Sequence, residues 1–317
     1  MGALIGRTIE LVARVPEAVA ASAAAFFVAA VTLYRLGAIK EARYPGHADP
    51  ALYYNVAQRM NAGQGMTIDY AWEYLSGQHP LPQYAFGYWL PLPSAMMSLA
   101  LHLRNSLASA LAVNVLMTVL LAVATYFLAR GLIHSPWVPA VASVLVSVQP
   151  FVSHFAVTSE AAIYFAAFAV ASMALAVRAQ SHVWLWPVAG VFAGLAGLSR
   201  SEGLVLIAVL VIAAAASLPK GRRVAFVGAL VAGYVLVTLP LYVQNVRHFG
   251  SLLPPASANF PFITDYNDLY ALHVDHSFSA LLGGGPWQFV DLRLSTLAVQ
   301  LDAGFRSMHS VDACVIL

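Results

Sequence analysis

The chain has 317 residues, of which 60% are hydrophobic and 9% are charged, and its mean hydropathy is +0.74. Soluble domains carry about 25% charged residues, so this composition excludes an ordinary soluble protein and predicts an integral membrane protein. The net charge of +2 gives no indication of a nucleic-acid partner, and the single cysteine, Cys314, excludes an intrachain disulfide and a cysteine metal site.

Apolar segments recur along the chain at lengths suited to a bilayer, where a spanning helix needs about 20 residues within a range of about 17–25. The first segment follows an N-terminus that carries Arg7 and Arg14. It is too long for a cleavable signal, so we expect it to remain in the membrane as an anchor. The predicted fold is an all-α polytopic membrane protein with about seven spans, at 18–37, 107–133, 136–152, 157–177, 183–199, 203–218 and 224–243.

The apolar segment 90–103 is the exception. Its 14 residues reach about 21 Å as a helix, and Pro91 and Pro93 open it. Basic residues mark cytoplasmic loops. The arginines before the first span and the cluster at 220–223 share the cytoplasmic side only if one early segment does not cross. We therefore expect 90–103 to form a helix that lies at the membrane interface.

This topology divides the chain into a cytoplasmic N-terminus (1–17), a transmembrane module (18–243) with a long outer loop (38–106), and an extracytoplasmic C-terminal part (244–317). The protein is expected in the plasma or inner membrane. Polar residues gathered on one face of so apolar a chain indicate a site, which we expect on the extracytoplasmic side. The residues on that face are Asp49, His79, Glu160, Arg200, Glu202, Arg247 and His248.

The end of the chain has two interpretations. The apolar stretch 292–301 is bounded by charged residues and is typical of the amphipathic approach to a further span. The last four residues, Cys-Val-Ile-Leu, match a prenylation pattern, but so short a match arises easily by chance. We expect a truncated reading frame rather than a lipid anchor.

Asp49 stands just after the first span and is followed by Pro50. One interpretation is structural, with Asp49 as a helix N-cap and Pro50 at the first helical position. The other makes Asp49 a general base or a metal ligand, because the helix dipole stabilises a carboxylate there. Tyr53 lies four residues on and shares its helical face, and Tyr54 follows directly.

Glu160 opens the segment 157–177 and also has two interpretations. It is either an acid in a helical first turn, capped by Thr158 or Ser159, or a second acid of a site shared with Asp49. The topology favours the second interpretation, because it places both acids on one side of the membrane.

The turn before 203–218 carries Ser199, Arg200 and Glu202. The spacing of Ser199 and Glu202 is that of a capping box, which favours a structural role for Glu202. Arg200 is left either to extend to the lipid headgroups or to hold a phosphate with its planar guanidinium.

Arg247 and His248 end the last predicted span before Gly250. They are either cations at a helix C-terminus or a phosphate clamp at the bilayer surface. The aromatic residues of the loop 66–90, which also holds His79, are consistent with an interfacial belt or with stacking on a sugar or prenyl chain.

In their order and spacing these motifs resemble the GT-C superfamily of polytopic glycosyltransferases, and within it the protein O-mannosyltransferase and aminoarabinose-transferase branch. The resemblance covers roughly residues 20–260. The matching stretches are Asp49-Pro-Ala-Leu-Tyr53-Tyr54, Gly63-Gln-Gly65, His79-Pro80, Tyr88-Trp89-Leu-Pro91, Pro150 with Ser159-Glu160, Gly197 to Gly203, and Arg247-His-Phe-Gly250.

The resemblance implies a polyprenyl-phosphate-linked sugar as donor, and a protein, lipid or glycan as acceptor. It implies Asp49 as the catalytic base and Glu160 as a second acid, with a divalent metal between them left open. It also implies that Arg247 and Arg200 face the lipid phosphate. Substrate binding is further expected of His248, Tyr53, Tyr54, His79 and Glu202.

Two other functions compete with this hypothesis. A transporter or flippase for lipid-linked sugars would use the same outer cavity without chemistry, although no inverted repeat typical of transporters is found in the sequence. A non-catalytic assembly subunit is the third hypothesis, which the abrupt end of the chain makes plausible, and the glycosyltransferase is the leading one.

Overall fold

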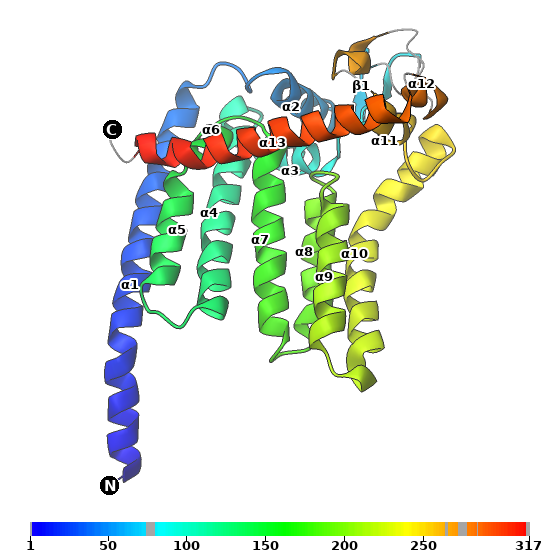
Figure 1. Cartoon of the computed structure of the whole chain (residues 1–317). Coiled ribbons are helices and arrows are strands. Elements are labelled where there is room, and N and C mark those ends of the chain that lie inside the picture. The colour runs from blue at the N-terminus through cyan, green and yellow to red at the C-terminus, as the bar shows by residue number, and fades with distance from the viewer. Residues whose placement is uncertain (1, 74–79, 264–265, 272–277, 284, 315–317) are drawn as a thin grey trace. The chain divides into compact units, whose positions relative to one another are not determined.

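The computed structural model describes residues 2–73, 80–263, 266–271, 278–283 and 285–314 (Figure 1). Its contacts group the chain into two units. Unit 1 comprises Met1–Gly63 with Leu90–Leu239, and unit 2 comprises Gln64–Trp89 with Pro240–Leu317. Helix α10 (Lys220–Phe249) contributes to both units, and the boundary falls at Pro240 inside it.

Unit 1 is built of helices. The long ones run side by side, with α2, α3 and α6 gathered at one end, hereafter the α2 end (Figure 1). Before α10 the elements are α1 (Gly2–Ala38), the 3-10 helix η1 (Ile39–Glu41), α2 (Ala48–Asn61), α3 (Leu92–Leu103), α4 (Leu107–Leu132), α5 (Val138–Val148), α6 (Pro150–Ala156), α7 (Ala161–Ala179), α8 (Leu185–Gly197) and α9 (Gly203–Ser217).

Within the described residues, four helices are long and apolar enough to cross a bilayer: Pro16–Glu41, Leu107–Leu132, Ala161–Ala179 and Lys220–Phe249. A fifth span results if α5 and α6, which are bent by 57° at their junction, count as one. The prediction of a multi-pass all-α membrane protein is confirmed, but the count of seven spans is not. The predicted spans 183–199 and 203–218 form α8 and α9, whose 13 and 15 residues fall short of about 20.

The segment 90–103 forms α3, whose 12 residues are also too few to cross a bilayer. Its first turn is fastened to two other helices. The Leu92 N–H donates to the Leu198 carbonyl oxygen at 3.0 Å, and Ser94 Oγ donates to the Tyr53 carbonyl oxygen at 2.9 Å. The helix α3 thereby connects α2 to the turn that follows α8.

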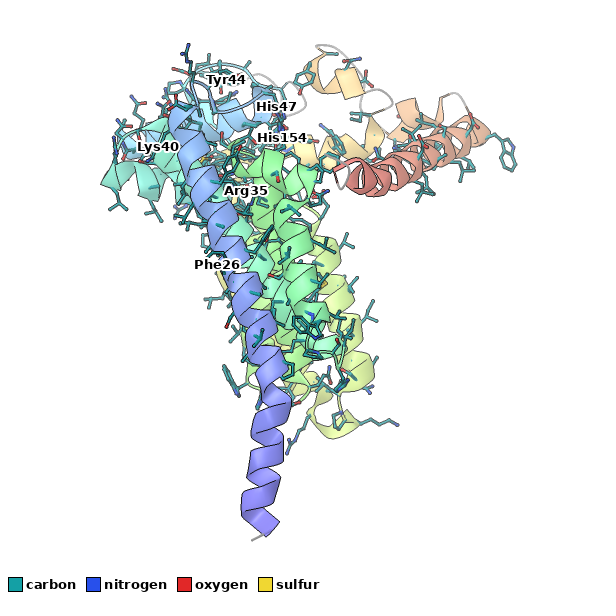
Figure 2. All side chains as sticks on the ribbon, turned by 90° about the vertical axis from the view of Figure 1, so that its left-hand side faces the viewer. Phe26, Arg35, Lys40, Tyr44, His47 and His154 are labelled. Carbon is teal, nitrogen blue, oxygen red and sulfur yellow. The ribbon has the colours of Figure 1, made fainter. Side chains whose placement is uncertain are left out.

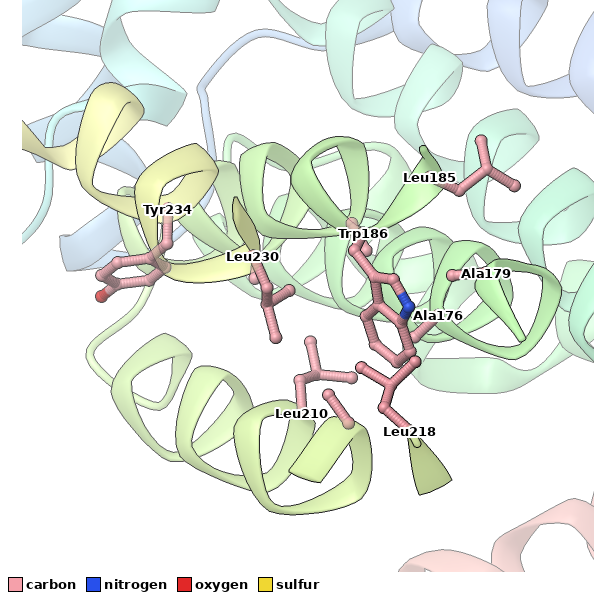
Figure 3. Close-up of a cluster of buried hydrophobic side chains, with 11 residues drawn as sticks. Ala176, Ala179, Leu185, Trp186, Leu210, Leu218, Leu230 and Tyr234 are labelled. Atoms are coloured by element: carbon pink, nitrogen blue, oxygen red, sulfur yellow. The ribbon is translucent and has the colours of Figure 1, made fainter. Parts of the chain in front are cut away.

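Small residues let α8 and α10 pack closely in unit 1. A Cβ atom at Gly190 would lie 1.9 Å from the Leu230 carbonyl oxygen, and one at Gly233 would lie 2.2 Å from the Pro187 oxygen. The indole of Trp186 is fully buried beside this contact. Figure 3 shows the cluster, with Ala176, Ala179, Leu185, Trp186, Leu210, Leu218, Leu230 and Tyr234 labelled.

Unit 2 combines a short antiparallel pair of strands with small helices and one long helix. Its elements are β1 (Thr67–Ile68), β2 (Gln83–Tyr84), the end of α10, α11 (Pro255–Asn259), η2 (Phe260–Phe262), η3 (Tyr266–Tyr270), α12 (Phe278–Leu282) and α13 (Pro286–Cys314). Aromatic contacts support the strands, including Trp72 against Trp89 with ring centroids 5.5 Å apart. The stretch 292–301 lies inside α13, which is not among the candidate spans of the described chain.

Candidate active site

Asp49 lies in the first turn of α2. The prediction that Asp49 is the N-cap is wrong by two positions, because the chain enters the helix at His47, which has the extended backbone of an N-cap residue. The carboxylate is half-buried, and within the described part of the chain no hydrogen bond or ion pair reaches it. Asp49 therefore has a carboxylate available to a ligand at a helix N-terminus, where a negative charge is favoured.

Glu160 is the N-cap of α7, so the prediction that Thr158 or Ser159 caps that helix is wrong. Its Oε1 accepts a hydrogen bond from the Ala161 N–H at 3.0 Å, and its Oε2 lies 3.6 Å from His47 Nε2. The residue is only 7% exposed. One carboxylate oxygen is thus fixed by the helix, and the other faces a histidine from the segment that carries Asp49.

Ser159 fastens the two acid-bearing segments together. Its N–H donates to the Pro45 carbonyl oxygen at 2.9 Å, and its Oγ lies 3.1 and 2.8 Å from the carbonyl oxygens of Pro45 and Pro50. Gly46 has φ +132°, and a Cβ atom there would lie 2.8 Å from Pro50 Cβ and 3.2 Å from Thr158 Cβ. The close approach of these segments therefore requires glycine at position 46.

Asn114, on α4, holds the turn before α7 from the helical side. Its fully buried Nδ2 group donates to the carbonyl oxygens of Phe155 at 3.2 Å, Thr158 at 2.6 Å and Glu160 at 3.2 Å. Its Oδ1 accepts a hydrogen bond from the Tyr164 hydroxyl at 2.8 Å. The sequence analysis missed Asn114, although a single amide inside the apolar segment 107–133 is a signal that points to a polar role.

Arg200 and Glu202 form an ion pair between α8 and α9. Arg200 Nε and Nη2 donate to Glu202 Oε1 at 3.1 and 2.8 Å. The predicted capping box is wrong, because Ser199 Oγ donates to the Leu195 carbonyl oxygen instead and Glu202 is itself the N-cap of α9. Glu202 therefore neutralises Arg200 rather than capping a helix through its side chain.

Both members of this pair are held in their charged forms. Burial works against the charge on Arg200, but the hydrogen bond to Glu202 and the charges of Glu202, Tyr53 and Glu160 raise its pKa overall. Burial likewise works to raise the pKa of Glu202, but the hydrogen bonds and charge of Arg200 lower it overall.

Tyr53 shows that the acids and the arginine share one neighbourhood. Its pKa is raised well above its ordinary value, first by burial and then by the negative charges of Glu160 and Asp49, while the charge of Arg200 and a hydrogen bond to the Leu90 backbone work in the opposite direction. The charges of both acids and of Arg200 therefore act on the buried Tyr53 hydroxyl.

The other predicted residues are placed differently. Tyr54 is half-buried, and burial raises its pKa. His248 belongs to unit 2, where its ring stacks on Tyr84 with centroids 4.3 Å apart and planes 5° apart. Arg247, in the same unit, is exposed and has no partner among the residues that the structure describes. His79 lies outside the described residues.

Over the described ranges, no three histidine, cysteine, aspartate or glutamate side chains are grouped so that they could hold an ion. Asp49 and Glu160 supply two carboxylates, and oxygen ligands of this kind suit magnesium or manganese when water or a substrate phosphate completes the shell.

The fold and the charge placement define a multi-pass membrane protein with an acidic cluster at one end of its helices. The sequence model of the dolichyl-phosphate-mannose-protein mannosyltransferase family matches residues 79–245, which is 167 of the 317 residues. The chain belongs to this family of GT-C membrane glycosyltransferases, and the resemblance stated above is confirmed. Searches among curated proteins and solved structures found no match.

The matched range includes part of the candidate site. Glu160, Arg200 and Glu202 lie within it, whereas Asp49 precedes it and Arg247 and His248 follow it. Membership in the family implies a lipid-linked sugar as donor, which narrows the chemistry expected of these residues.

Proposed function

We propose that the protein transfers a sugar from a polyprenyl-phosphate donor to an acceptor hydroxyl at the outer face of the membrane, with Asp49 as the general base. Membership in the family supports the donor class. The observation that carries the proposal is that the Asp49 segment packs on the Glu160 turn: Ser159 Oγ lies 2.8 Å from the Pro50 carbonyl oxygen, and His47 Nε2 lies 3.6 Å from Glu160 Oε2. Membership in a family of glycosyltransferases favours sugar transfer over transport.

In the proposed reaction, Asp49 removes the proton of the acceptor hydroxyl as the oxygen attacks the anomeric carbon of the sugar. The bond between that carbon and the phosphate oxygen breaks, and its electron pair leaves with the lipid phosphate. Attack from the side opposite the phosphate inverts the anomeric configuration. A positioned base of this kind contributes about 10²–10⁴-fold to a rate. Asp49 suits the role because its carboxylate is not engaged within the described structure.

Glu160 is proposed as the second acid. Asn114 donates a hydrogen bond to its backbone carbonyl oxygen, and the Ala161 N–H donates one to its Oε1. The side chain is therefore held in one orientation. A carboxylate in that position either orients the acceptor or shares a divalent cation with Asp49. Loss of transfer on chelation, restored by added magnesium or manganese, supports the shared cation; transfer that is insensitive to chelation supports the orienting role.

Negative charge develops on the departing phosphate, where a fixed cation is most effective. Arg200 lies in the same unit as the acids but is already bonded to Glu202. Arg247 and His248 belong to unit 2, and their role as phosphate ligands stays a prediction from the family resemblance. Within unit 1, Arg200, Tyr53 and Tyr54 are proposed to contact the substrates.

The test is sugar transfer by membranes that contain the Asp49→Asn variant, with a radiolabelled polyprenyl-phosphate sugar as donor. We expect transfer to fall by at least about 100-fold, because the amide cannot accept the proton. The matched control is Glu41→Gln, which removes an exposed acid of the same unit and is expected to retain transfer within about twofold. Parental transfer by Asp49→Asn at equal membrane abundance would exclude Asp49 as the base.

The membrane face is tested separately by thiol labelling of intact cells. Cys314 is replaced by serine, and single cysteines are placed beside Asp49, Glu160 and Arg130. We expect a membrane-impermeant reagent to label the first two positions and not the third. Labelling of the position beside Arg130 alone would place the acids on the cytoplasmic face and contradict transfer at the outer face.

A further inference from the structure

Arg35 is a buried cation near the end of the first candidate span. It lies in the last turn of α1 and is only 4% exposed. Arginines at helix ends usually extend toward the headgroups, whereas Arg35 lies on the bundle side of α1, toward His154 (Figure 2). Its Nη1 donates to Thr118 Oγ1 at 3.1 Å, and its Nη2 donates to Ser153 Oγ at 2.9 Å and to the Ser147 carbonyl oxygen.

All three acceptors are neutral oxygens, and no ion pair involves Arg35 in the part of the chain that the structure describes. A buried charge is costly unless something compensates it. Ser147 is the next-to-last residue of α5, so its carbonyl is one of those that the helix leaves without an internal partner. The partial negative charge at the C-terminus of α5 therefore compensates the guanidinium.

The contacts of Arg35 bracket the bend between α5 and α6. Ser147 precedes the junction at Gln149 and Pro150, and Ser153 follows it. One guanidinium thus bonds both arms of a 57° bend and also α4, through Thr118. The planar fork of arginine suits three acceptors in fixed directions, which a lysine ammonium on a flexible stem does not match.

The same stretch of chain leads directly to Glu160. Thr118 lies one helical turn from Asn114 on α4, so both present their side chains on one face. Asn114 bonds the carbonyl oxygens of Phe155 and Glu160, while Arg35 holds Ser153 at the start of the same stretch. The segment between α5 and α7 is therefore fastened at its beginning by Arg35 and at its end by Asn114.

We propose that Arg35 is a positioning residue that fixes the α5–α6 bend and, through that bend, the place of Glu160. The claim about the bend stands on the contacts of Arg35 alone. The claim that the bend matters for catalysis rests on the function proposed above for Glu160. The two claims predict different measurements, so they can fail separately.

The first measurement is thiol labelling of a buried cysteine in the fastened segment. Ala156, the last residue of α6, is 0% exposed, and Ala156→Cys in a Cys314→Ser background gives a single hidden thiol. We expect Arg35→Met and Arg35→Lys each to raise the labelling rate of this thiol about tenfold, because the bridging hydrogen bonds are lost. The matched control is Arg130→Met, which removes a cation that pairs with Glu17 and is expected to leave the rate within about twofold.

The second measurement is sugar transfer by the same Arg35 variants without the added cysteine. A displaced Glu160 should lower kcat about tenfold or more while KM for the lipid-linked donor stays within about twofold. Parental labelling and parental kcat in Arg35→Met would overturn the proposal, and so would full retention of both by Arg35→Lys, since a point charge would then suffice.

A second pair of variants serves if Arg35→Met does not insert. Ser153→Ala and Thr118→Val each remove a single acceptor, and about threefold faster labelling is expected of each. Unchanged labelling in both would likewise overturn the proposal.

If the unaltered protein transfers no sugar from any donor supplied, the proposed function fails and the labelling ratios still decide whether Arg35 fixes the bend. If transfer occurs and Arg35 variants label faster but keep their kcat, the bend is real and its link to Glu160 is wrong.

Discussion

Two helices of unit 1 begin after the same dipeptide, Ser159-Glu160 before α7 and Ser201-Glu202 before α9, and in both the glutamate is the N-cap residue. Beyond this the two turns differ. The Glu160 side chain is 9% exposed and bonds its own helix, whereas the Glu202 side chain is 49% exposed and pairs with Arg200. A helix start can therefore be inferred from a local pattern, but the role of its acid depends on the residues that pack against the turn.

The difference originates in long-range contacts. Beneath Glu160, Asn114 and Ser159 bond backbone atoms that are distant in sequence. Beneath Glu202, the helix start packs backbone against backbone, and a Cβ atom at Gly203 would lie 2.2 Å from Gly197 Cα. The first turn is held by polar side chains that fix one geometry, and the second by close packing that leaves its acid at the surface.

Among the variants that test this comparison, replacement of Asn114 should have the largest effect on the free energy of unfolding. Asn114→Leu keeps the volume but leaves the carbonyl oxygens of the Glu160 turn and the Tyr164 hydroxyl without their partner. We expect a loss of about 2–3 kcal/mol in the free energy of unfolding, measured by thermal denaturation in detergent. Thr125→Val, which removes a hydrogen bond within the same helix, should cost under about 0.5 kcal/mol. Equal midpoints for the two variants would show that the amide does not hold the turn.

The two glutamates should differ in their effect on transfer. Glu160→Gln still accepts the Ala161 N–H, so the helix start survives, but the carboxylate charge is lost at a buried position. We expect kcat/KM to fall about 100-fold, against less than about tenfold for Glu202→Gln. Both are measured at matched membrane abundance. Equal losses would mean that burial does not distinguish the two acids.

The close approach at Gly46 predicts a third difference, which contrasts two glycines of positive φ. Gly46→Ala meets Pro50 and Thr158, whereas Gly63, at φ +74°, has open space around its missing Cβ atom. We expect Gly46→Ala to cost about 2–3 kcal/mol and Gly63→Ala about 1 kcal/mol in the free energy of unfolding. If Gly46→Ala cost no more than its control, the packing of the Asp49 segment on the Glu160 turn would be loose.

Much of the fold follows from local sequence. Apolar runs of about 20 residues locate the long helices, because a bilayer imposes that length wherever it is crossed. The helices α8 and α9 are shorter than the predicted spans 183–199 and 203–218, because residues at the ends of these spans belong to turns. Helix starts were misplaced by one or two positions at Asp49 and Glu160, because the extended backbone of an N-cap depends on the entering chain as well as on residue type.

The candidate site was predictable to a similar degree. Counting membrane crossings predicted that Asp49 and Glu160 share one side of the membrane, which stays a prediction; the structure joins their segments through the hydrogen bond of Ser159 Oγ to the Pro50 carbonyl oxygen. The residues that hold them there could not be found in this way. Asn114 and Arg35 act on atoms 46 and 112 residues away, and no local pattern specifies such partners. Their signal was only that a polar side chain stood in an apolar segment.

The smallest expected effect concerns the pH dependence of the Glu202 turn. Burial works to raise the pKa of Glu202, but its bonds to Arg200 outweigh burial and lower the pKa below the ordinary value of 4.5. A carboxyl whose pKa is lowered on folding stabilises the protein above the unfolded value, and this stability is lost as the pH falls through the folded value. Because the pair is half-exposed, we expect Glu202→Gln to cost at most about 1 kcal/mol at pH 7.

That cost should shrink as the pH is lowered from 7 to 3, because Glu202 takes up a proton as the pH falls through its lowered pKa. The measurement is the difference in Tm between the parent and Glu202→Gln at the two pH values. Glu41→Gln, an exposed acid of the same unit, should show little difference at either pH. A Tm difference that grew as the pH fell would be opposite to the expected pH dependence. The ion pair would then be a surface contact without a stabilising role.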